Sequence, residues 1–477
     1  MTTTDIVQLL YLAASALFIL GLQSLGKADT ARRGVLLAEV GMALAVAGTL
    51  LHHEIVTYHW IVVSVVIGSA IGTAMGLFIP MVKMPERIAL SHAFGGLAVA
   101  LVGIAEYHRH GSHLGATTLT AVGLEVFLGA LTFTGSLLAF GKLQGVVRGA
   151  PVVWRGQNVM NLLGVAAALA GVVFLVAAPS TPYLLFGILA VGLVLGVTLV
   201  VPVGGADMPV VICLLNAYAG LAAAATGFAL GNNVLIICGA LDGGSGLILG
   251  LMMSKAMNRS FTNVLFGASD AGGVPASATA SAGGGGGGGS ATVSTVEDAA
   301  AILEAARSVI IVPGYGMAVS QAQHAVRDLA NALTAAGVDV KYAIHPVAGR
   351  MPGHMNVLLA EANVPYEQLF DLDSINDDFG NTDVAIVVGA NDVVNPAAKT
   401  QKSSPIYGMP VLAVDKARTA ICFKRSFKPG FAGVENELFT RPSTMMVLGD
   451  AKDSVAALVR AVREASGGGH GHGRMAA

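Results

Sequence analysis

The chain has 477 residues, of which 54% are hydrophobic and only 12% are charged. A soluble domain carries roughly twice that share of charged residues, so the composition excludes a wholly soluble protein. The formal net charge of −2 also excludes the strongly basic surface that nucleic-acid binding requires.

Long apolar runs fill the first 262 residues. Because a helix needs roughly 20 apolar residues to cross a bilayer, we predict a polytopic α-helical transmembrane domain of about nine spans over residues 1–262. The first run lacks a basic n-region and a small-residue cleavage site, which favours a span over a cleaved signal peptide. The predicted spans are Ile6–Leu25, Val35–Leu51, Trp60–Val82, Ile88–Ile104, Leu119–Phe140, Val159–Ala177, Leu184–Val201, Pro209–Leu230 and Val234–Met253.

The cations between these spans predict their orientation. Ten of the eleven lysines and arginines in this region fall in alternate loops, and Arg109 falls in the other set. Cytoplasmic loops carry an excess of Lys and Arg. We therefore predict that the N-terminus lies outside the cell and that everything after the ninth span is cytoplasmic.

Two low-complexity stretches follow. Residues 263–296 are rich in Gly, Ser and Ala and cannot build a core, so we predict a flexible linker. Residues 466–477 are predicted to be a disordered tail, with loose metal binding by His470 and His472 as the alternative. The three cysteines are too scattered for a disulfide framework or a metal knuckle, and we predict no metal site.

Residues 297–465 have the pattern of a soluble domain. The segment "SVIIVPGYGMAVSQAQHAVRDLANALTAAGVDVKYAIHPVAG" alternates strand, glycine turn, helix, glycine stop and strand, which is typical of a βαβ unit. Further short apolar strands occur in "DVAIVVGAND", "MPVLAVD", "TAICFKRS" and "TMMVLGD". This alternation predicts an α/β Rossmann-like domain with a parallel sheet, whose ligands bind at the carboxyl ends of the strands.

A glycine turn in this domain favours a dinucleotide ligand. Gly314 and Gly316 form a G-x-G between a strand and a helix, although Val319 stands at the third position. Such glycines allow the backbone to approach a pyrophosphate at a helix N-terminus. An ordinary strand–helix turn is the alternative.

The ends of two other strands favour NADP over NAD. NAD sites commonly place a carboxylate at the end of the second strand, and residues 338–344 end without one. A later strand end carries two cations and a hydroxyl, which suit a phosphate dianion. These residues are Lys424, Arg425 and Ser426.

Polar residues within the predicted spans indicate a second site. Among the 12 histidines, His92 in "ALSHAFGGL" is the one that lies clearly within a span. An imidazole is costly in hydrocarbon and titrates near neutral pH, so it favours proton handling; a core histidine bonded to a helix carbonyl remains the alternative. Asn216, in mid-span, can hold a water beside an imidazole. Three other acids within spans, to which we assign no role, are Glu39, Glu125 and Asp242.

Seven segments together resemble the β subunit of the proton-translocating NAD(P) transhydrogenases. They are "GYGMAVSQAQ", "AGRMPGHMNVLLAEA", "GANDVVNPAAK", "SSPIYGMPVL", "FKRS", "KAMNRSFTNVLFG" and "SHAFGGLA". The resemblance covers nearly the whole chain apart from the linker and the tail. It implies a Re/Si-specific NAD(P)⁺ transhydrogenase, which couples hydride transfer from NADH to NADP⁺ to inward proton movement across the membrane.

The resemblance also implies partners and a location. NADP(H) would bind this chain, while NAD(H) and further membrane helices would come from a partner α subunit, since the chain shows no second dinucleotide fingerprint. The family works as a dimer of such assemblies, in bacteria in the cytoplasmic (inner) membrane. It binds NADP(H) in a flipped orientation on the sheet.

Residue roles carried over from the family fall into two groups. The proton path would use His92 and Asn216, and Asp207 would couple it to the soluble domain, although a plain loop carboxylate is the alternative for Asp207. Our own candidate for a relay between protonation and a nucleotide site that alternates between open and occluded states is Asp392, because it is close in sequence to the nucleotide loop. The implied NADP(H) contacts are Gly314, Tyr315, Gly316, Met317, Ala318, Val319, Gly349, Arg350, Met351, Pro352, Gly389, Asn391, Asp392, Val393, Lys424, Arg425, Ser426 and the lid residue Gly430. Phe431 stands where many members have Tyr, which puts a lid hydroxyl contact in doubt.

Two other functions compete with this one. The first is an NADP(H)-regulated membrane channel or transporter without hydride transfer. The second is a membrane-anchored NADPH reductase, which predicts a substrate pocket and an acid near the nicotinamide, and no motif indicates either.

Overall fold

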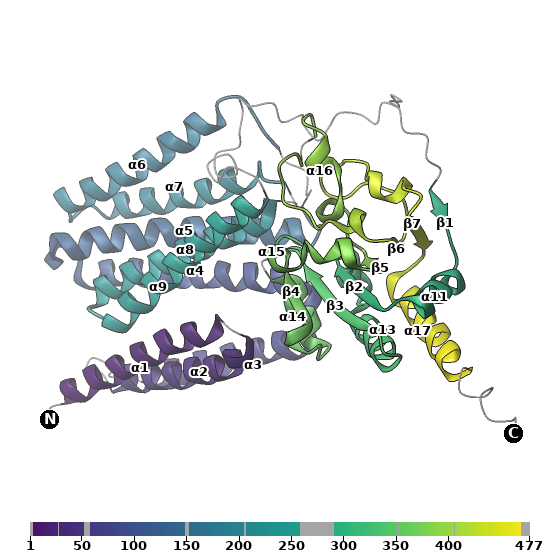
Figure 1. Cartoon of the computed structure of the whole chain (residues 1–477). Coiled ribbons are helices and arrows are strands. Elements are labelled where there is room, and N and C mark those ends of the chain that lie inside the picture. Colours follow the sequence, from purple (N-terminus) through teal and green to yellow (C-terminus); the bar gives the residue numbers. More distant parts are fainter. Residues whose placement is uncertain are drawn as a thin grey trace, which may run out of the picture. The chain divides into compact units, whose positions relative to one another are not determined.

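The computed structural model describes residues 3–26, 28–51, 58–147, 152–204, 207–257, 291–351, 353–404 and 406–468 (Figure 1). The chain divides into two compact units, with the boundary after Leu251. Most of the predicted linker, and the tail from residue 469 with His470 and His472, lie outside the described residues. The domain limits given above therefore stay predictions.

Nine helices in the described part of the chain are long and apolar enough to cross a membrane, which confirms the predicted helical architecture. Several extend past the apolar run that predicted them, because a helix continues into polar residues beyond the hydrocarbon layer while its backbone bonds remain paired. They are α1 (Thr3–Leu25), α2 (Ala28–Leu50), α3 (His59–Phe78), α4 (Met84–His110), α5 (Ala116–Leu143), α6 (Gln157–Ala177), α7 (Pro182–Val200), α8 (Met208–Leu230) and α9 (Asn233–Ala256).

Helix α5 is the centre of the helical unit and packs against α4, α6, α7 and α8. Glycines permit the closest approaches, since a methyl group on Gly96 of α4 would stand 2.8 Å from the carbonyl oxygen of Gly129 on α5. Small residues let apolar helices approach in this way. Helix α3 differs, because no residue of it is buried within the described chain.

A lysine joins the ends of two of these helices. Lys142, near the end of α5, donates from Nζ to the carbonyl oxygens of Val200, Val201 and Val203 at 3.1, 2.6 and 2.8 Å. The last carbonyls of a helix have no intrahelical donor, and a lysine near a helix C-terminus can satisfy them. Lys142 therefore holds the end of α7 against α5.

The second unit contains a seven-stranded parallel sheet in the order β1-β7-β6-β5-β2-β3-β4. Apart from β1, this is the doubly wound order of dinucleotide-binding domains, with the strand order reversing between β2 and β5. The predicted Rossmann-like fold is confirmed. The strands are β1 (Thr292–Val293), β2 (Ser308–Pro313), β3 (Asp339–Ile344), β4 (Leu369–Asp371), β5 (Val384–Val388), β6 (Thr419–Lys424) and β7 (Thr444–Leu448).

Helical segments cover the sheet and complete its core. Helices α11, α12 and α13 pack against α17, while alternate strand residues such as Val387 and Cys422 pack with Phe379 and Phe439. The helices are α11 (Val296–Ala305), α12 (Tyr315–Ser320), α13 (Gln323–Ala335), α14 (His354–Glu361), α15 (Leu372–Ile375), α16 (Ala397–Thr400) and α17 (Ala451–Gly468).

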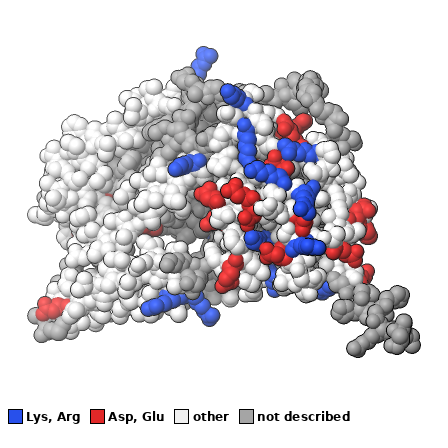
Figure 2. All heavy atoms as spheres, viewed as in Figure 1, with Lys and Arg blue, Asp and Glu red and all other residues white. Residues whose placement is uncertain are grey.

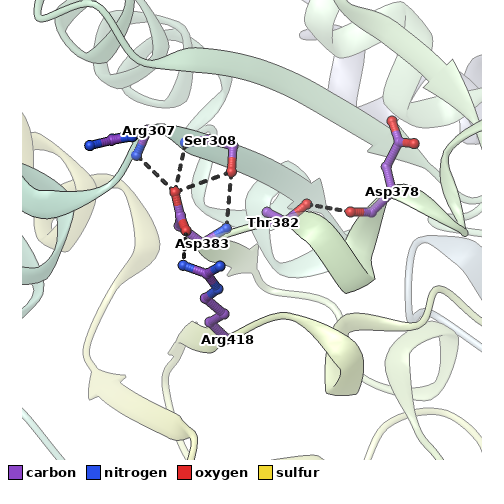
Figure 3. Close-up of polar contacts among 6 residues, drawn as sticks. All are labelled: Arg307, Ser308, Asp378, Thr382, Asp383 and Arg418. Atoms are coloured by element: carbon purple, nitrogen blue, oxygen red, sulfur yellow. Dashed lines mark hydrogen bonds and ion pairs between the residues drawn. The ribbon is translucent and has the colours of Figure 1, made fainter.

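One carboxylate joins the amino ends of three strands (Figure 3). Asp383, just before β5, accepts hydrogen bonds from the backbone N–H groups of Arg307 and Ser308 at 2.9 and 3.3 Å, and from Arg418 Nη1 at 2.9 Å. The Arg307 N–H contributes most to holding the pKa of Asp383 below its usual value. The starts of β2, β5 and β6 are thereby fixed, at the edge opposite the strand ends that bear the motifs.

Charged residues are distributed unevenly over the two units. Figure 2 shows Lys, Arg, Asp and Glu side chains gathered over the α/β unit, while the face of the helical unit in this view is largely uncharged. An uncharged surface over helices of this length suits hydrocarbon. Together these features indicate a membrane protein.

Candidate functional site

Two glycine turns meet where the strand order reverses. The Gly314 N–H donates to Val388 O and the Gly316 N–H donates to Gly389 O, both at 2.9 Å. A methyl group on Gly316 would stand 2.7 Å from Gly389 Cα, and Gly389 has a φ of +68°. The contact between the two turns therefore requires glycine at positions 316 and 389, whether or not a ligand also approaches them.

The residues after the first turn differ in exposure. Met317 and Ala318 are fully buried, whereas Val319 is 40% exposed. Any ligand contact of the two buried residues would use their backbone. The side chain of Val319 can touch a ligand directly.

An aromatic and cationic cluster forms beside the turn. Arg350 Cζ lies 4.7 Å from the ring centroid of Tyr315, and the Tyr315 and Phe431 rings are 5.5 Å apart. These residues come from the turn after β2, the loop after β3 and the segment after β6. A guanidinium over an aromatic face is attracted by the ring quadrupole, so the three segments stabilise one another.

A buried histidine shapes the loop after β3. His354 Nδ1 accepts a hydrogen bond from the backbone N–H of Arg350 at 3.0 Å, and Gly349 turns there with a φ of +108°. Burial, with the nearby charge of Arg350, lowers the pKa of His354 to about 4. The imidazole is therefore neutral at pH 7. Met351 is buried, and the predicted contact Pro352 lies outside the described residues.

Asp392, after β5, contacts the segment that follows β6. Its Oδ2 accepts a hydrogen bond from the backbone N–H of Ala432 at 3.0 Å. A methyl group on Gly430 would stand 2.6 Å from its Oδ1. Burial raises the pKa of Asp392, and the Ala432 N–H and the charge of Lys424 oppose that shift. Val393, the next predicted contact, is buried beside it.

Two asparagines complete the attachment of this segment, which we define as the lid, residues 427–436. Asn436 Nδ2 donates to the backbone oxygen of Asn391, and Asn395 Nδ2 donates to that of Glu435, both at 3.0 Å. The lid therefore lies closed against the loop after β5. Sequence reasoning did not single out Asn395 or Asn436, although Asn395 lies within the quoted strand-end motif "GANDVVNP".

The cations at the end of β6 have different surroundings. Lys424 Nζ donates to Lys428 O at 3.1 Å and lies 4.3 Å from the Phe439 ring centroid. With its amide oxygen facing Lys424, Asn391 accepts from the same Nζ at 3.1 Å. Burial lowers the pKa of Lys424. Arg425 is exposed and Ser426 is half-buried, so Lys424 anchors the lid while Arg425 is open to an anion.

Three helices meet at the histidine of the helical unit. His92 on α4 lies near Asn216 on α8 and Asp242 on α9, and its buried Nδ1 has no hydrogen-bond partner among the described residues. Asn216 Nδ2 donates to Asp242 Oδ1 at 3.2 Å. The structure thus brings together His92 and Asn216, which were predicted, and Asp242, to which no role was assigned.

The other acids singled out from the sequence occupy different positions in the helical unit. Asp207 occupies the residue before α8, at the start of that helix. Glu125 is fully buried in α5 beside Thr226, and Glu39 is exposed on α2. The described residues contain no group of three or more His, Cys, Asp or Glu side chains that could hold a metal ion.

Comparisons with known proteins agree over almost the full length. The family described as "NAD(P) transhydrogenase beta subunit" matches residues 7–461. A protein of Rhodospirillum rubrum named "NAD(P) transhydrogenase subunit beta" is 50% identical over 471 residues, which cover 96% of this chain and 100% of that protein. A second protein of that name, from a defined strain of the same species, matches to the same extent.

Proposed function

Because the chain belongs to the NAD(P) transhydrogenase beta subunit family, we propose that it binds NADP(H) and takes part in hydride transfer from NADH to NADP⁺. The observation that carries this proposal is the meeting of two glycine turns beneath a closed lid where the strand order reverses. Ligands of open α/β sheets bind at that point. The name of the family implies an alpha subunit as partner, and we propose that NAD(H) binds there.

The residues at the strand ends fit a dinucleotide phosphate. The backbone of residues 314–319 would face the pyrophosphate, and exposed Arg425, with Ser426 and Lys424, would bind the 2′-phosphate. The remaining contacts proposed are Tyr315, Gly349, Arg350, Met351, Pro352, Gly389, Asn391, Asp392, Val393 and Gly430. Bound NADP⁺ supplies the carbon that accepts the hydride, and the lid would exclude water from it.

The position of the cations supports a flipped orientation. In the usual arrangement the ribose-binding residue follows the second strand, which here is β3. The cations instead follow β6, on the other side of the point where the strand order reverses. The adenosine end would therefore lie toward β6 and the nicotinamide toward Tyr315.

The helical unit would supply the coupled proton path. His92 would take up and release a proton, with Asn216 as its hydrogen-bonding neighbour. Protonation there would shift the α/β unit between open and occluded states, with Asp207 and Asp392 in the coupling. Reciprocity then requires that the redox state of the nucleotide changes the affinity for the proton.

The proposed setting is a bacterial cytoplasmic membrane. The N-terminus would lie outside and the α/β unit in the cytoplasm, as the cations between the spans indicate. The alpha subunit would add further membrane helices. Two such assemblies would form a dimer.

Reconstitution with the alpha subunit tests the proposal. Vesicles containing both chains should transfer hydride from NADH to NADP⁺ and move protons only while they do so. The variant His92→Ala should abolish proton movement and change the pH dependence of NADP(H) release. NADP(H) binding without hydride transfer would favour a regulated channel, and an unchanged pH dependence of release in His92→Ala would contradict the coupling.

A further inference from the structure

The carboxylate of Asp242 extends the histidine–asparagine pair into a third helix. Asn216 Nδ2 donates to its Oδ1 at 3.2 Å. A methyl group on Gly246, one helical turn after Asp242, would stand 2.8 Å from the same nitrogen. The amide of Asn216 therefore fits between Asp242 and Gly246, and the geometry of the contact is set by α9 as much as by α8.

Asp242 lies at a depth where a charged side chain is costly in a membrane. It lies nine residues after the start of α9, about 13 Å along a helix that rises 1.5 Å per residue. This places a carboxylate near the middle of a predicted span. Ionisable residues at such depth are rare and mark sites of function by default.

Asp242 is the carboxylate that lies near His92 and Asn216. Glu125, the fully buried acid of α5, lies near Thr226 and Glu106 instead. Besides His92, the titratable and charged residues on α4, on α5 and α8, which pack against it, and on α9 are Glu86, Arg87, Glu106, Tyr107, His108, Arg109, His110, Glu125, Lys142, Cys213, Tyr218, Cys238, Asp242 and Lys255.

We propose that Asp242 is a positioning residue that acts through Asn216 as the counter-charge of protonated His92, and so sets the pH at which His92 releases its proton. An anion stabilises a nearby imidazolium and orients the amide between them. This inference rests on the proposed role of His92 in proton movement.

Isotope-edited infrared titration of the histidines tests the inference without any hydride transfer. The purified chain is titrated in a bilayer, and the spectrum of His92→Asn is subtracted to isolate His92. In Asp242→Asn, deprotonation of His92 should move about one pH unit lower, because an opposite charge is lost. Asp242→Glu, which retains the charge, should restore most of the shift. Glu39→Gln, which removes an exposed carboxylate on α2, is the matched control and should change nothing.

A double variant tests whether Asn216 transmits the effect. In an Asn216→Ala background, Asp242→Asn should shift the titration of His92 by much less than in the wild type, because coupled residues are not additive. An unchanged titration in Asp242→Asn, or an equal shift with and without Asn216, would overturn the proposal.

A second readout links the inference to turnover. In vesicles with the alpha subunit, the alkaline limb of the pH profile of coupled hydride transfer should move to lower pH in Asp242→Asn. If the wild-type assembly transferred no hydride, the proposed function would fail while the infrared result would still decide the role of Asp242.

Discussion

Gly430 lies against the carboxylate of Asp392, so that a methyl group on the glycine would stand 2.6 Å from Oδ1. Asp392 Oδ2 also accepts the hydrogen bond of the Ala432 N–H at 3.0 Å. The carboxylate of Asp392 is thus one of the groups that hold the lid closed, beside Asn395 and Asn436. Substitutions at Gly430 or Asp392 can change these lid contacts without replacing a residue of the β-sheet.

Gly430→Ala should loosen the lid. The added methyl group forces the lid backbone or Asp392 to move, and such overpacking costs about 1–3 kcal/mol. We expect NADP(H) to dissociate roughly tenfold faster, as measured by stopped-flow nucleotide release from the assembly. Gly380→Ala is the control, since a methyl group there meets nothing within 4 Å. Equal release rates in the two variants would contradict the contact.

Asp392→Asn should stabilise the chain near neutral pH. Burial raises the pKa of Asp392, so its stabilising contribution is present at low pH and is lost as pH rises through the folded pKa. The variant should melt about 2 °C higher than the wild type at pH 7, with the difference shrinking toward pH 4. Thermal scans across this range check the sign, and a difference that grows as pH falls would contradict it.

Asp383→Asn should have the opposite pH dependence. Hydrogen bonds from Arg307 and Ser308 and the charge of Arg418 lower the pKa of Asp383. A depressed carboxyl pKa stabilises the fold above the unfolded value and loses that effect as pH falls through the folded value. The variant should melt a few degrees lower at pH 7 and approach the wild type below about pH 4. Asp377→Asn, which alters an exposed acid nearby, should change little at any pH.

Arg425→Ala should weaken NADP(H) more than NAD(H). A hydrogen bond between charged groups contributes about 1.5–3 kcal/mol, so the Kd for NADPH should rise roughly 10- to 100-fold. Calorimetry or fluorescence titration gives both constants. The control is Arg463→Ala, an exposed cation on α17. An equal loss of affinity for NADPH and NADH would show that Arg425 does not bind the 2′-phosphate.

Lys142→Met should destabilise the helical unit. It would remove the Nζ donor from the carbonyls of Val200, Val201 and Val203. The carbonyls of Val200 and Val201 keep a backbone N–H donor each, but that of Val203 loses the Lys142 bond, and an unpaired buried acceptor costs about 1–3 kcal/mol. A lower thermal midpoint in detergent, by a few degrees, is the expected result. Lys255→Met alters an exposed lysine in the last turn of α9 and should leave the midpoint unchanged.

The sequence predicted the architecture because its signals are local. Hydropathy identified the spans, and the strand and glycine pattern identified the parallel sheet. Helix ends were less predictable: α4 runs from Met84 to His110, against a predicted span of Ile88–Ile104. Hydropathy measures only the apolar part of a helix, so polar turns at either end leave no signal.

The site was predicted where its residues follow strands and missed where they depend on packing. Gly314 and Gly389 stand at strand ends, whose carboxyl termini share one edge in any parallel sheet. Asn436 and Asp242 were missed because each is placed by a hydrogen bond to a residue far away in the sequence. The partner of Asn436 is 45 residues away and that of Asp242 is 26 residues away. No periodicity specifies which loop or helix will face them, so only the folded chain identifies their partners.

The hydrogen bonds from Gly314 to Val388 and from Gly316 to Gly389 make the turns after β2 and β5 a single rigid body. Neither turn can shift alone without breaking its hydrogen bond to the other, so this pair of turns cannot open or close by itself. A nucleotide bound there as proposed would be exchanged by movement of the lid, at a rate set by the few side chains that hold the lid closed.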